Sequence, residues 1–214
     1  MSGRYERVLV VTSVDREAAT IPDREDIVVV TSGVGRTNAA ATTTEVLIER
    51  GPFDAVLNIG VAGTLAPEIL PVGSPIVGAS SVYVEEGLIT PDGFEDMIGL
   101  GFPLGDFAGN VVPGHVDLVA RATEIAAAGV IATVATCSGT ADAVAMVRER
   151  THAIAEAMEG AAVVHAARRR GVPAMEFRVI SNTTGDRSAQ FWDLPAAFAS
   201  LSEHVPALLE VVLD

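Results

Sequence analysis

Short apolar runs rich in β-branched residues recur along the chain and alternate with longer segments of helical periodicity. Such runs occupy residues 7–13, 26–33, 54–60, 74–84, 129–136 and 173–181, and each predicts a strand buried on both faces. Between them the pattern predicts helices over residues 37–50, 116–128, 141–150, 155–170 and 195–213. This alternation is typical of an α/β protein with a largely parallel or mixed sheet covered by helices.

Two segments show how the helices end and where a long loop lies. The helix predicted over residues 155–170 ends with three arginines, followed by Gly171 and Pro173, which is a strong stop signal. Residues 87–114 are rich in glycine and proline with scattered Phe and Asp, and they predict a long loop or lid.

Length and charge limit the protein class. At 214 residues with 49% hydrophobic residues, we expect a single domain over residues 1–214. The net charge of −14 disfavours nucleic acid and anionic membranes as partners. We find no apolar stretch long enough to span a bilayer and no signal peptide, so we expect a cytoplasmic protein. The sole cysteine, Cys137, is interpreted as a buried structural thiol.

Polar or small residues follow the predicted strands, where ligands of open α/β sheets bind. The turn at residues 31–40 has two glycines, but Asn38 replaces the third glycine of a dinucleotide fingerprint, so we expect no nicotinamide cofactor. This turn either packs tightly or holds a phosphate or ribose. In "NIGVAG", Ala62 and Gly63 would let a flat ligand approach the backbone. Glu17 follows the first strand as a candidate general base, or as a surface charge.

Two further segments carry candidate binding groups. In "EAMEGAA", Glu159 precedes a run of small residues, and it either grips a sugar hydroxyl pair or favours the positive end of a helix. Met158 beside it would offer apolar surface under the ligand. In "RVISNTTGDR", Ser181 and Asn182 form a polar cluster, and the carboxamide of Asn182 offers both a donor and an acceptor to a heterocycle. Asp186 and Arg187 either form an ion pair that braces the loop or belong to the site.

Taken together, the glutamate after the first strand, "TSGVGRTNAA", "NIGVAG", "AMEGAA" and "RVISN" resemble, in this order, the nucleoside phosphorylase and nucleosidase superfamily. The resemblance covers nearly the whole chain and is greatest to the futalosine hydrolase branch, nucleosidases of an alternative menaquinone pathway. It implies a three-layer α/β/α fold with a mixed twisted sheet, a purine nucleoside substrate, no cofactor and no metal. It also implies a homodimer or higher homo-oligomer.

The resemblance assigns roles to residues at matching positions. It places Glu17 where the acid that activates water stands, Met158 and Glu159 at the ribose, and Arg178 where an arginine supports the site. Asn182 stands where the adenine-specific relatives have aspartate, which favours a 6-oxopurine such as hypoxanthine.

Further positions are expected to line the substrate site: Val61, Ala62, Gly63 and Ser181. Of these, Val61 replaces a serine of the adenine-specific relatives. Trp192 also matches the futalosine branch, although a single large ring favours a core position.

The expected reaction is hydrolysis of an N-glycosidic bond, with Glu17, Glu159 and Asn182 as the catalytic residues. Positive charge develops on the sugar and negative charge on the base, so the site must stabilise both. Three alternatives remain open: a phosphorylase that holds phosphate with Arg36, an adenine-releasing nucleosidase, and a nucleoside-binding protein without catalysis. The proton donor to the base and the 5′ substituent of the substrate are not determined by the sequence.

Overall fold

The structure, a computed structural model, describes residues 5–213. Its strands are β1 (Val8–Thr12), β2 (Ile27–Thr31), β3 (Ala55–Thr64), β4 (Pro75–Tyr83), β5 (Gly87–Thr90), β6 (Gly93–Asp96), β7 (Val111–Pro113), β8 (Ala128–Thr133), β9 (Ala155–Ala157) and β10 (Ala174–Thr183). Its helices are α1 (Asp15–Ala18), α2 (Arg36–Glu49), α3 (Val116–Ala122), α4 (Ala141–Thr151), α5 (Gly160–Arg169) and α6 (Leu194–Leu213).

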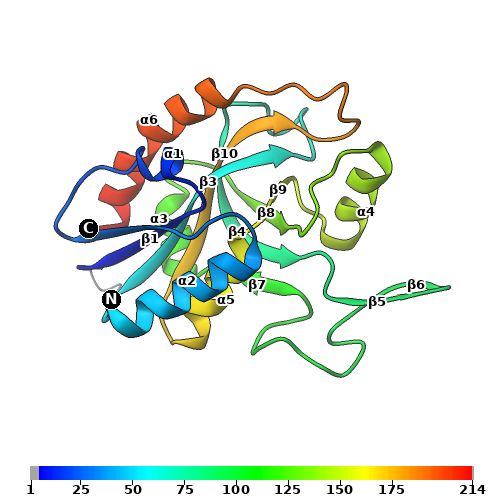
Figure 1. Ribbon diagram of the computed structural model, residues 1–214, viewed down its shortest axis with the longest axis horizontal. Helices are drawn as coiled ribbons and strands as arrows, with labels where there is room; N and C mark the ends of the chain where they lie inside the picture. The colour runs from blue at the N-terminus through cyan, green and yellow to red at the C-terminus, as the bar shows by residue number, and fades with distance from the viewer. Residues whose placement is uncertain (1–4, 214) are drawn as a thin grey trace.

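The main sheet is mixed and partly closed on itself. Strands β1, β2, β3 and β10 run parallel to one another, whereas β4, β8 and β9 run in the opposite direction. The order β10-β4-β8-β9-β3 closes into a ring because β10 also pairs with β3, and β1 and β2 extend from it (Figure 1). The expected mixed α/β sheet is therefore confirmed. The expected three-layer arrangement holds in part, because helices cover both faces of the sheet but five of its strands close into a barrel.

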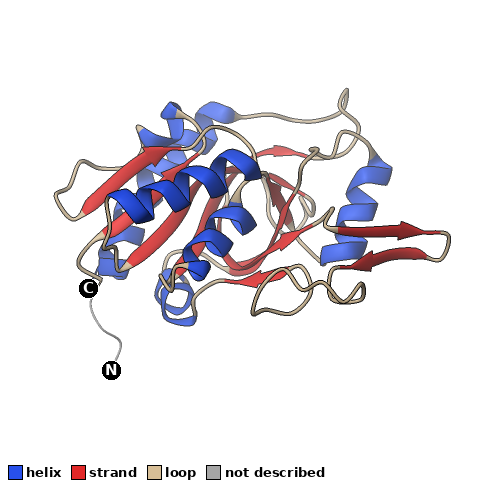
Figure 2. Ribbon diagram, turned by 60° about the horizontal axis from the view of Figure 1, so that its bottom comes forward, coloured by secondary structure: helices blue, strands red, loops and turns tan. Residues whose placement is uncertain are grey.

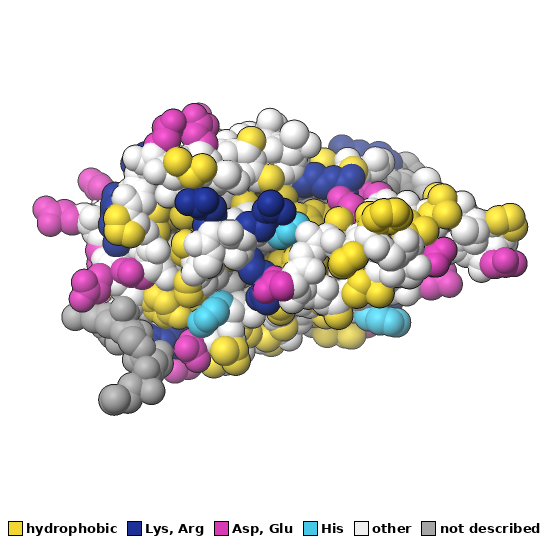
Figure 3. Space-filling view, turned by 90° about the horizontal axis from the view of Figure 1, so that it is seen from below, with side chains coloured by type: hydrophobic (Ala, Val, Ile, Leu, Met, Phe, Trp, Pro, Cys, Tyr) yellow, Lys and Arg dark blue, Asp and Glu magenta, His cyan; other side chains and the backbone are white. Residues whose placement is uncertain are grey.

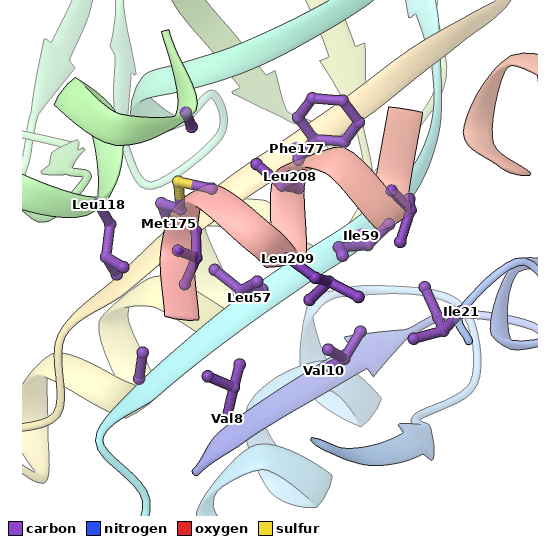
Figure 4. Packing of buried hydrophobic residues seen from close by; sticks show 14 of the residues in the cluster. Val8, Val10, Ile21, Leu57, Ile59, Leu118, Met175, Phe177, Leu208 and Leu209 are labelled. Atoms are coloured by element: carbon purple, nitrogen blue, oxygen red, sulfur yellow. The ribbon is translucent and has the colours of Figure 1, made fainter. Parts of the chain in front are cut away.

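Apolar side chains on the two faces of the sheet account for the helix packing. On one face, residues of β1, β3 and β10 pack with α3 and α6, and Figure 4 shows Leu57, Ile59 and Phe177 in contact range of the α6 residues Leu208 and Leu209. On the other face, Leu9, Val56 and neighbours pack against α2 and α5, which lie side by side (Figure 2). Burial of each such side chain contributes about 1.5–3 kcal/mol.

Helix α6 corrects the expectation that no segment is long enough to span a membrane. By length and composition its 20 residues, with a mean hydropathy of 1.4 in its most apolar window, meet that criterion. However, Ala197, Leu201, Val205 and Leu208 are among the α6 side chains buried against the sheet. Packing in the protein core therefore explains the apolar composition of this helix.

Three predicted element boundaries also differ. The predicted helix over residues 155–170 is split, because residues 155–157 form β9 and α5 begins only at Gly160. The predicted helix over 116–128 ends at Ala122, and Ala128 already belongs to β8. The predicted loop over 87–114 contains β5, β6 and β7. Strand β2 is only partly buried, because it forms an edge of the sheet.

The β5–β6 hairpin projects from the body of the protein beside α4 (Figures 1 and 2). The guanidinium of Arg150 on α4 lies 4.1 Å from the centre of the Phe94 ring on β6. This cation–π contact ties the hairpin to the helix.

Candidate active site

The parallel direction of four strands brings their polar ends to one edge of the sheet. Because β1, β2, β3 and β10 run the same way, the segments after them meet there. Strand β9 runs antiparallel to β3, so the chain beyond β9 returns along β3. Glu159 thereby comes within hydrogen-bond distance of Arg178, the residue of β10 that is paired with Gly60 of β3. The expectation that these strand ends gather is therefore confirmed.

Glu17 lies on α1, the short helix directly after β1, and its side chain is only 2% exposed. Its Oε2 accepts hydrogen bonds from the backbone N–H groups of Ser13 (2.8 Å) and Val14 (3.2 Å). Its Oε1 accepts from the N–H of Val61 (2.9 Å). A carboxylate has about four acceptor positions, so Oε1 keeps one free. Gly60 is required here, because a Cβ would collide with Glu17.

Glu159 immediately precedes α5, whereas we expected it in the first turn of a helix. Its side chain does not cap that helix. Its Oε1 accepts from the backbone N–H of Gly35 (2.9 Å), and its Oε2 accepts from Nη2 of Arg178 (3.3 Å). The residue is 4% exposed. Each carboxylate oxygen therefore keeps one acceptor position, which suits a pair of adjacent hydroxyl groups.

Arg178 on β10 is fully buried and connects the acidic groups. Its Nε donates to Oε1 of Glu176 (2.8 Å), its Nη2 donates to Oδ1 of Asn58 (2.5 Å), and its Nη1 donates to the carbonyl of Val61 (3.4 Å). Burial opposes the guanidinium charge, but the surrounding carboxylates, Glu176 foremost, raise the pKa of Arg178.

Sequence reasoning missed Glu176 and Asn58, which hold this arginine. Glu176 is fully buried, and Oγ of Ser81 donates to its Oε2 at 2.5 Å. Burial raises the pKa of Glu176, against the opposing effect of Arg178. Gly160 leaves room for this carboxylate, because a Cβ at that position would overlap it. The sequence signal that could have identified Glu176 is a charged residue inside an apolar strand, because buried charged residues are almost always paired.

Asn182 lies near the end of β10, just after a bulge between Ile180 and Asn182, and is 7% exposed. Its Oδ1 accepts from Oγ of Ser181 (2.8 Å), and its Nδ2 donates to the carbonyl of Thr183 (2.9 Å). One N–H and one acceptor position of the carboxamide remain available to a ligand. Oγ of Ser181 also lies 3.2 Å from the carbonyl oxygen of Ala62, and its single hydrogen is donated either to that oxygen or to Oδ1 of Asn182.

A cavity of about 320 Å³ adjoins this carboxamide. It is lined by Gly63, Cys137, Ser138, Gly139, Glu156, Asn182, Arg187, Gln190 and Trp192. The structure thus brings Gly63 and Asn182 together. Ala62 is buried behind them, and Met158 is partly buried against a neighbouring apolar cluster at the β8 side of the barrel.

Three expectations about this region are wrong. Cys137 is exposed at the cavity wall, so it is not a buried thiol. Trp192 is 46% exposed at the same cavity and not in the core. Within the described chain Asp186 and Arg187 form no ion pair. Asp186 instead accepts from the N–H of Ala141 (3.3 Å), and Arg187 stacks 5.1 Å from the Trp192 ring centre.

The glycine turn after β2 is arranged around carboxylates. Gly33 and Gly35 have φ values of 84° and 96°, which favour glycine, and the Gly35 N–H is taken by Glu159. Arg36 pairs with Glu85 and Glu86, at 3.0 Å in both cases. Both groups that a bound phosphate would use are therefore engaged by acids.

The fold and the site define an α/β protein with a small-molecule cavity at the carboxyl ends of its parallel strands. The chain belongs to the Phosphorylase superfamily, whose family model matches residues 13–214. It is 36% identical to the futalosine hydrolase of Streptomyces coelicolor, over 94% of this chain and 86% of that protein. It is 30% identical to the 5′-methylthioadenosine/S-adenosylhomocysteine nucleosidase of Colwellia psychrerythraea, over 78% of this chain and 70% of that protein.

Solved structures agree on the fold. The native structure of the Helicobacter pylori futalosine hydrolase matches with a TM-score of 0.75 and 21% identity, and the match covers 98% of each chain.

Proposed function

We propose that the protein is a nucleosidase that hydrolyses the N-glycosidic bond of futalosine and releases hypoxanthine, a step of menaquinone biosynthesis. The observation that carries this proposal is the placement of a neutral carboxamide, Asn182, at a cavity beside two buried carboxylates, Glu17 and Glu159. The 36% identity to a futalosine hydrolase over most of both chains supports the same substrate.

The free acceptor positions suggest a division of roles. Glu159 keeps one position on each oxygen, so it accepts from the two ribose hydroxyls and stabilises the positive charge that develops on the sugar. Glu17 keeps one position on Oε1 and there orients and deprotonates the attacking water. Arg178 touches neither sugar nor base in this scheme, and it positions Glu159.

Asn182 recognises the base. Its remaining N–H donates to N7 or O6 of a 6-oxopurine. A neutral amide is not a net proton donor, so the proton that the leaving base gains comes from another group or from solvent.

Hydrolysis is favoured over phosphorolysis by the environment of Arg36. Two glutamates lie 3.0 Å from this guanidinium, and their negative charge repels a phosphate anion. An adenine-releasing nucleosidase is the second candidate, supported by the 30% identity to the Colwellia relative. A binding protein without catalysis would not need the buried Glu17.

Product analysis tests the proposal. Purified protein is incubated with futalosine, its 6-amino deoxy analogue, inosine and methylthioadenosine, with and without phosphate, and the products are separated by chromatography. We expect hypoxanthine and a free sugar from futalosine at a rate that phosphate does not change. A sugar 1-phosphate would identify a phosphorylase, and release of adenine alone would identify the second candidate.

We further propose a homodimer formed through the β5–β6 side of the protein. Leu88, Ile89, Ile98 and Phe102 are between 47% and 77% exposed, and Figure 3 shows hydrophobic side chains gathered toward the end that carries this hairpin. Exposed apolar side chains grouped in this way support a protein interface. A cytoplasmic location stays a prediction, as does a single domain over the whole chain.

A further inference from the structure

Three neighbouring strands place two polar residues on either side of a glycine. In the β3–β10 register Asn182 is paired with Gly63, and in the β3–β9 register Glu156 is paired with the same Gly63. Residues paired across neighbouring strands project from the same face of a sheet. Neighbouring strands lie about 4.8 Å apart, so the two backbones are roughly 10 Å apart with the backbone of Gly63 between them.

All three residues line the 320 Å³ cavity. Gly63 contributes no side chain, so a flat heterocycle would lie over its backbone with Asn182 at one edge and Glu156 at another. A Cβ at Gly63 would lie 2.9 Å from Cγ2 of Thr184 and 3.1 Å from Nδ2 of Asn182, so these two side chains closely overhang one side of the Gly63 backbone.

Glu156 is a prepared acceptor that the proposed mechanism does not use. It is 5% exposed, and within residues 5–213 its hydrogen bonds come from Ser138, whose backbone N–H donates to Oε1 (2.8 Å) and whose Oγ donates to Oε2 (2.5 Å). No Lys or Arg within residues 5–213 pairs with it. Each oxygen keeps an acceptor position, and a buried carboxylate without a cation is costly unless it has a further partner.

We propose that Glu156 accepts a hydrogen bond from N1–H of the bound 6-oxopurine, while Asn182 binds the N7 and O6 edge. This inference rests on the proposed function and adds a residue that determines base specificity. A 6-oxopurine carries a hydrogen on N1, whereas the N1 of a 6-aminopurine is an acceptor. The carboxylate of Glu156 therefore attracts hypoxanthine and repels the N1 lone pair of adenine, and Asn182 alone does not make that distinction.

Binding of free bases to the full-length wild-type protein tests the inference by calorimetry. We expect hypoxanthine to bind roughly 10- to 100-fold more tightly than 1-methylhypoxanthine, which lacks the N1 hydrogen, because a hydrogen bond to a charged group is lost. Equal affinity for the two bases, or no binding of hypoxanthine, would overturn the proposal without any variant being made.

Variants separate the hydrogen bond from a simple steric effect. Glu156→Ala removes the carboxylate and opens space, so it should bring the two affinities together. Glu156→Gln, which can donate to N1 of adenine, should shift the ratio of hypoxanthine to adenine affinity by about tenfold or more toward adenine. Glu203→Gln, an exposed acid on α6, is the charge-matched control and should leave both ratios unchanged. Persistent discrimination in Glu156→Ala, or an unchanged adenine ratio in Glu156→Gln, would contradict the assignment.

The results distinguish a failure of this inference from a failure of the proposed function. Futalosine that stays intact, combined with preserved discrimination at N1, would refute the reaction but keep the role of Glu156. Cleavage of futalosine without discrimination at N1 would keep the reaction and refute that role.

Discussion

Nη2 of Arg178 lies 3.3 Å from Oε2 of Glu159, and both side chains are almost completely buried. The same guanidinium contacts Glu176 at 2.8 Å, so one arginine bridges two buried carboxylates. This arrangement holds Glu159 in a single position while leaving its two oxygens partly free.

Arg178→Met should destabilise the protein by about 3–5 kcal/mol, because it leaves two buried carboxylates without a cation. Urea unfolding followed by circular dichroism measures this loss. Arg24→Met, which removes the partly exposed ion pairs with Asp26 and Glu210, is the control, and we expect each pair to contribute at most about 1 kcal/mol. Similar losses in the two variants would mean that the buried cluster has no special role in stability.

Glu17→Gln should lower turnover by about 10²- to 10⁴-fold, because the amide does not accept a proton from water. Binding of hypoxanthine should change little, since Glu17 contacts the backbone directly after β1 and that of β3, and does not line the base cavity. Steady-state kinetics and calorimetry measure the two quantities. Asp15→Asn, on the same short helix but exposed, should retain activity. Unchanged turnover in Glu17→Gln would refute the assignment.

Asn182→Asp should move base preference toward adenine by about tenfold, because a carboxylic acid at this position donates to N7 while accepting from an exocyclic amine. The measurement is the ratio of kcat/KM for futalosine and its 6-amino deoxy analogue. Thr184→Ser, on the segment after β10, keeps the hydroxyl that donates to the Thr64 carbonyl and serves as control. A constant ratio in Asn182→Asp would mean that this side chain does not select the base.

The stability of Glu156→Gln relative to the wild type should depend on pH. Burial raises the folded-state pKa of Glu156, although the Ser138 hydrogen bonds oppose the shift. The folded state then binds this proton more tightly than the unfolded state, so the contribution to stability is present below the unfolded pKa and is lost as pH rises through the folded value. Urea unfolding at several pH values above 4 should therefore favour Glu156→Gln increasingly as pH rises. A pH-independent difference would contradict the shift.

Ile89→Asp should convert the proposed homodimer to a monomer of 22.1 kDa, because it places a charge in an apolar interface. Light scattering after size-exclusion chromatography measures the mass. Ile48→Asp, which is 60% exposed on α2 away from the hairpin, should remain dimeric. A wild-type protein that is already monomeric would refute the proposed dimer.

The sequence by itself determined the order of the principal elements and the chemistry at the strand ends. Helices α2, α4 and α6 begin and end within about one residue of their predicted bounds, because caps and apolar periodicity are local signals. Glu17, Glu159 and Arg178 were identified from motifs, and the structure places them in one buried network. Asn182 was identified in the same way and lies at the adjoining cavity.

Only the tertiary structure decided how the barrel closes and what surrounds each charge. The hydrophobic pattern reports which faces are buried but not which distant strand pairs with which, so the β3–β10 pairing was not predictable from it. The break between β9 and α5 depends on the pairing of Glu156 with Gly63, and that pairing also turns an apparent first-turn acid into a wall of the cavity. The tertiary structure likewise identified Glu176 as a partner of Arg178 and Trp192 as a residue that lines the cavity. Burial and partner choice arise from contacts between segments far apart in the chain.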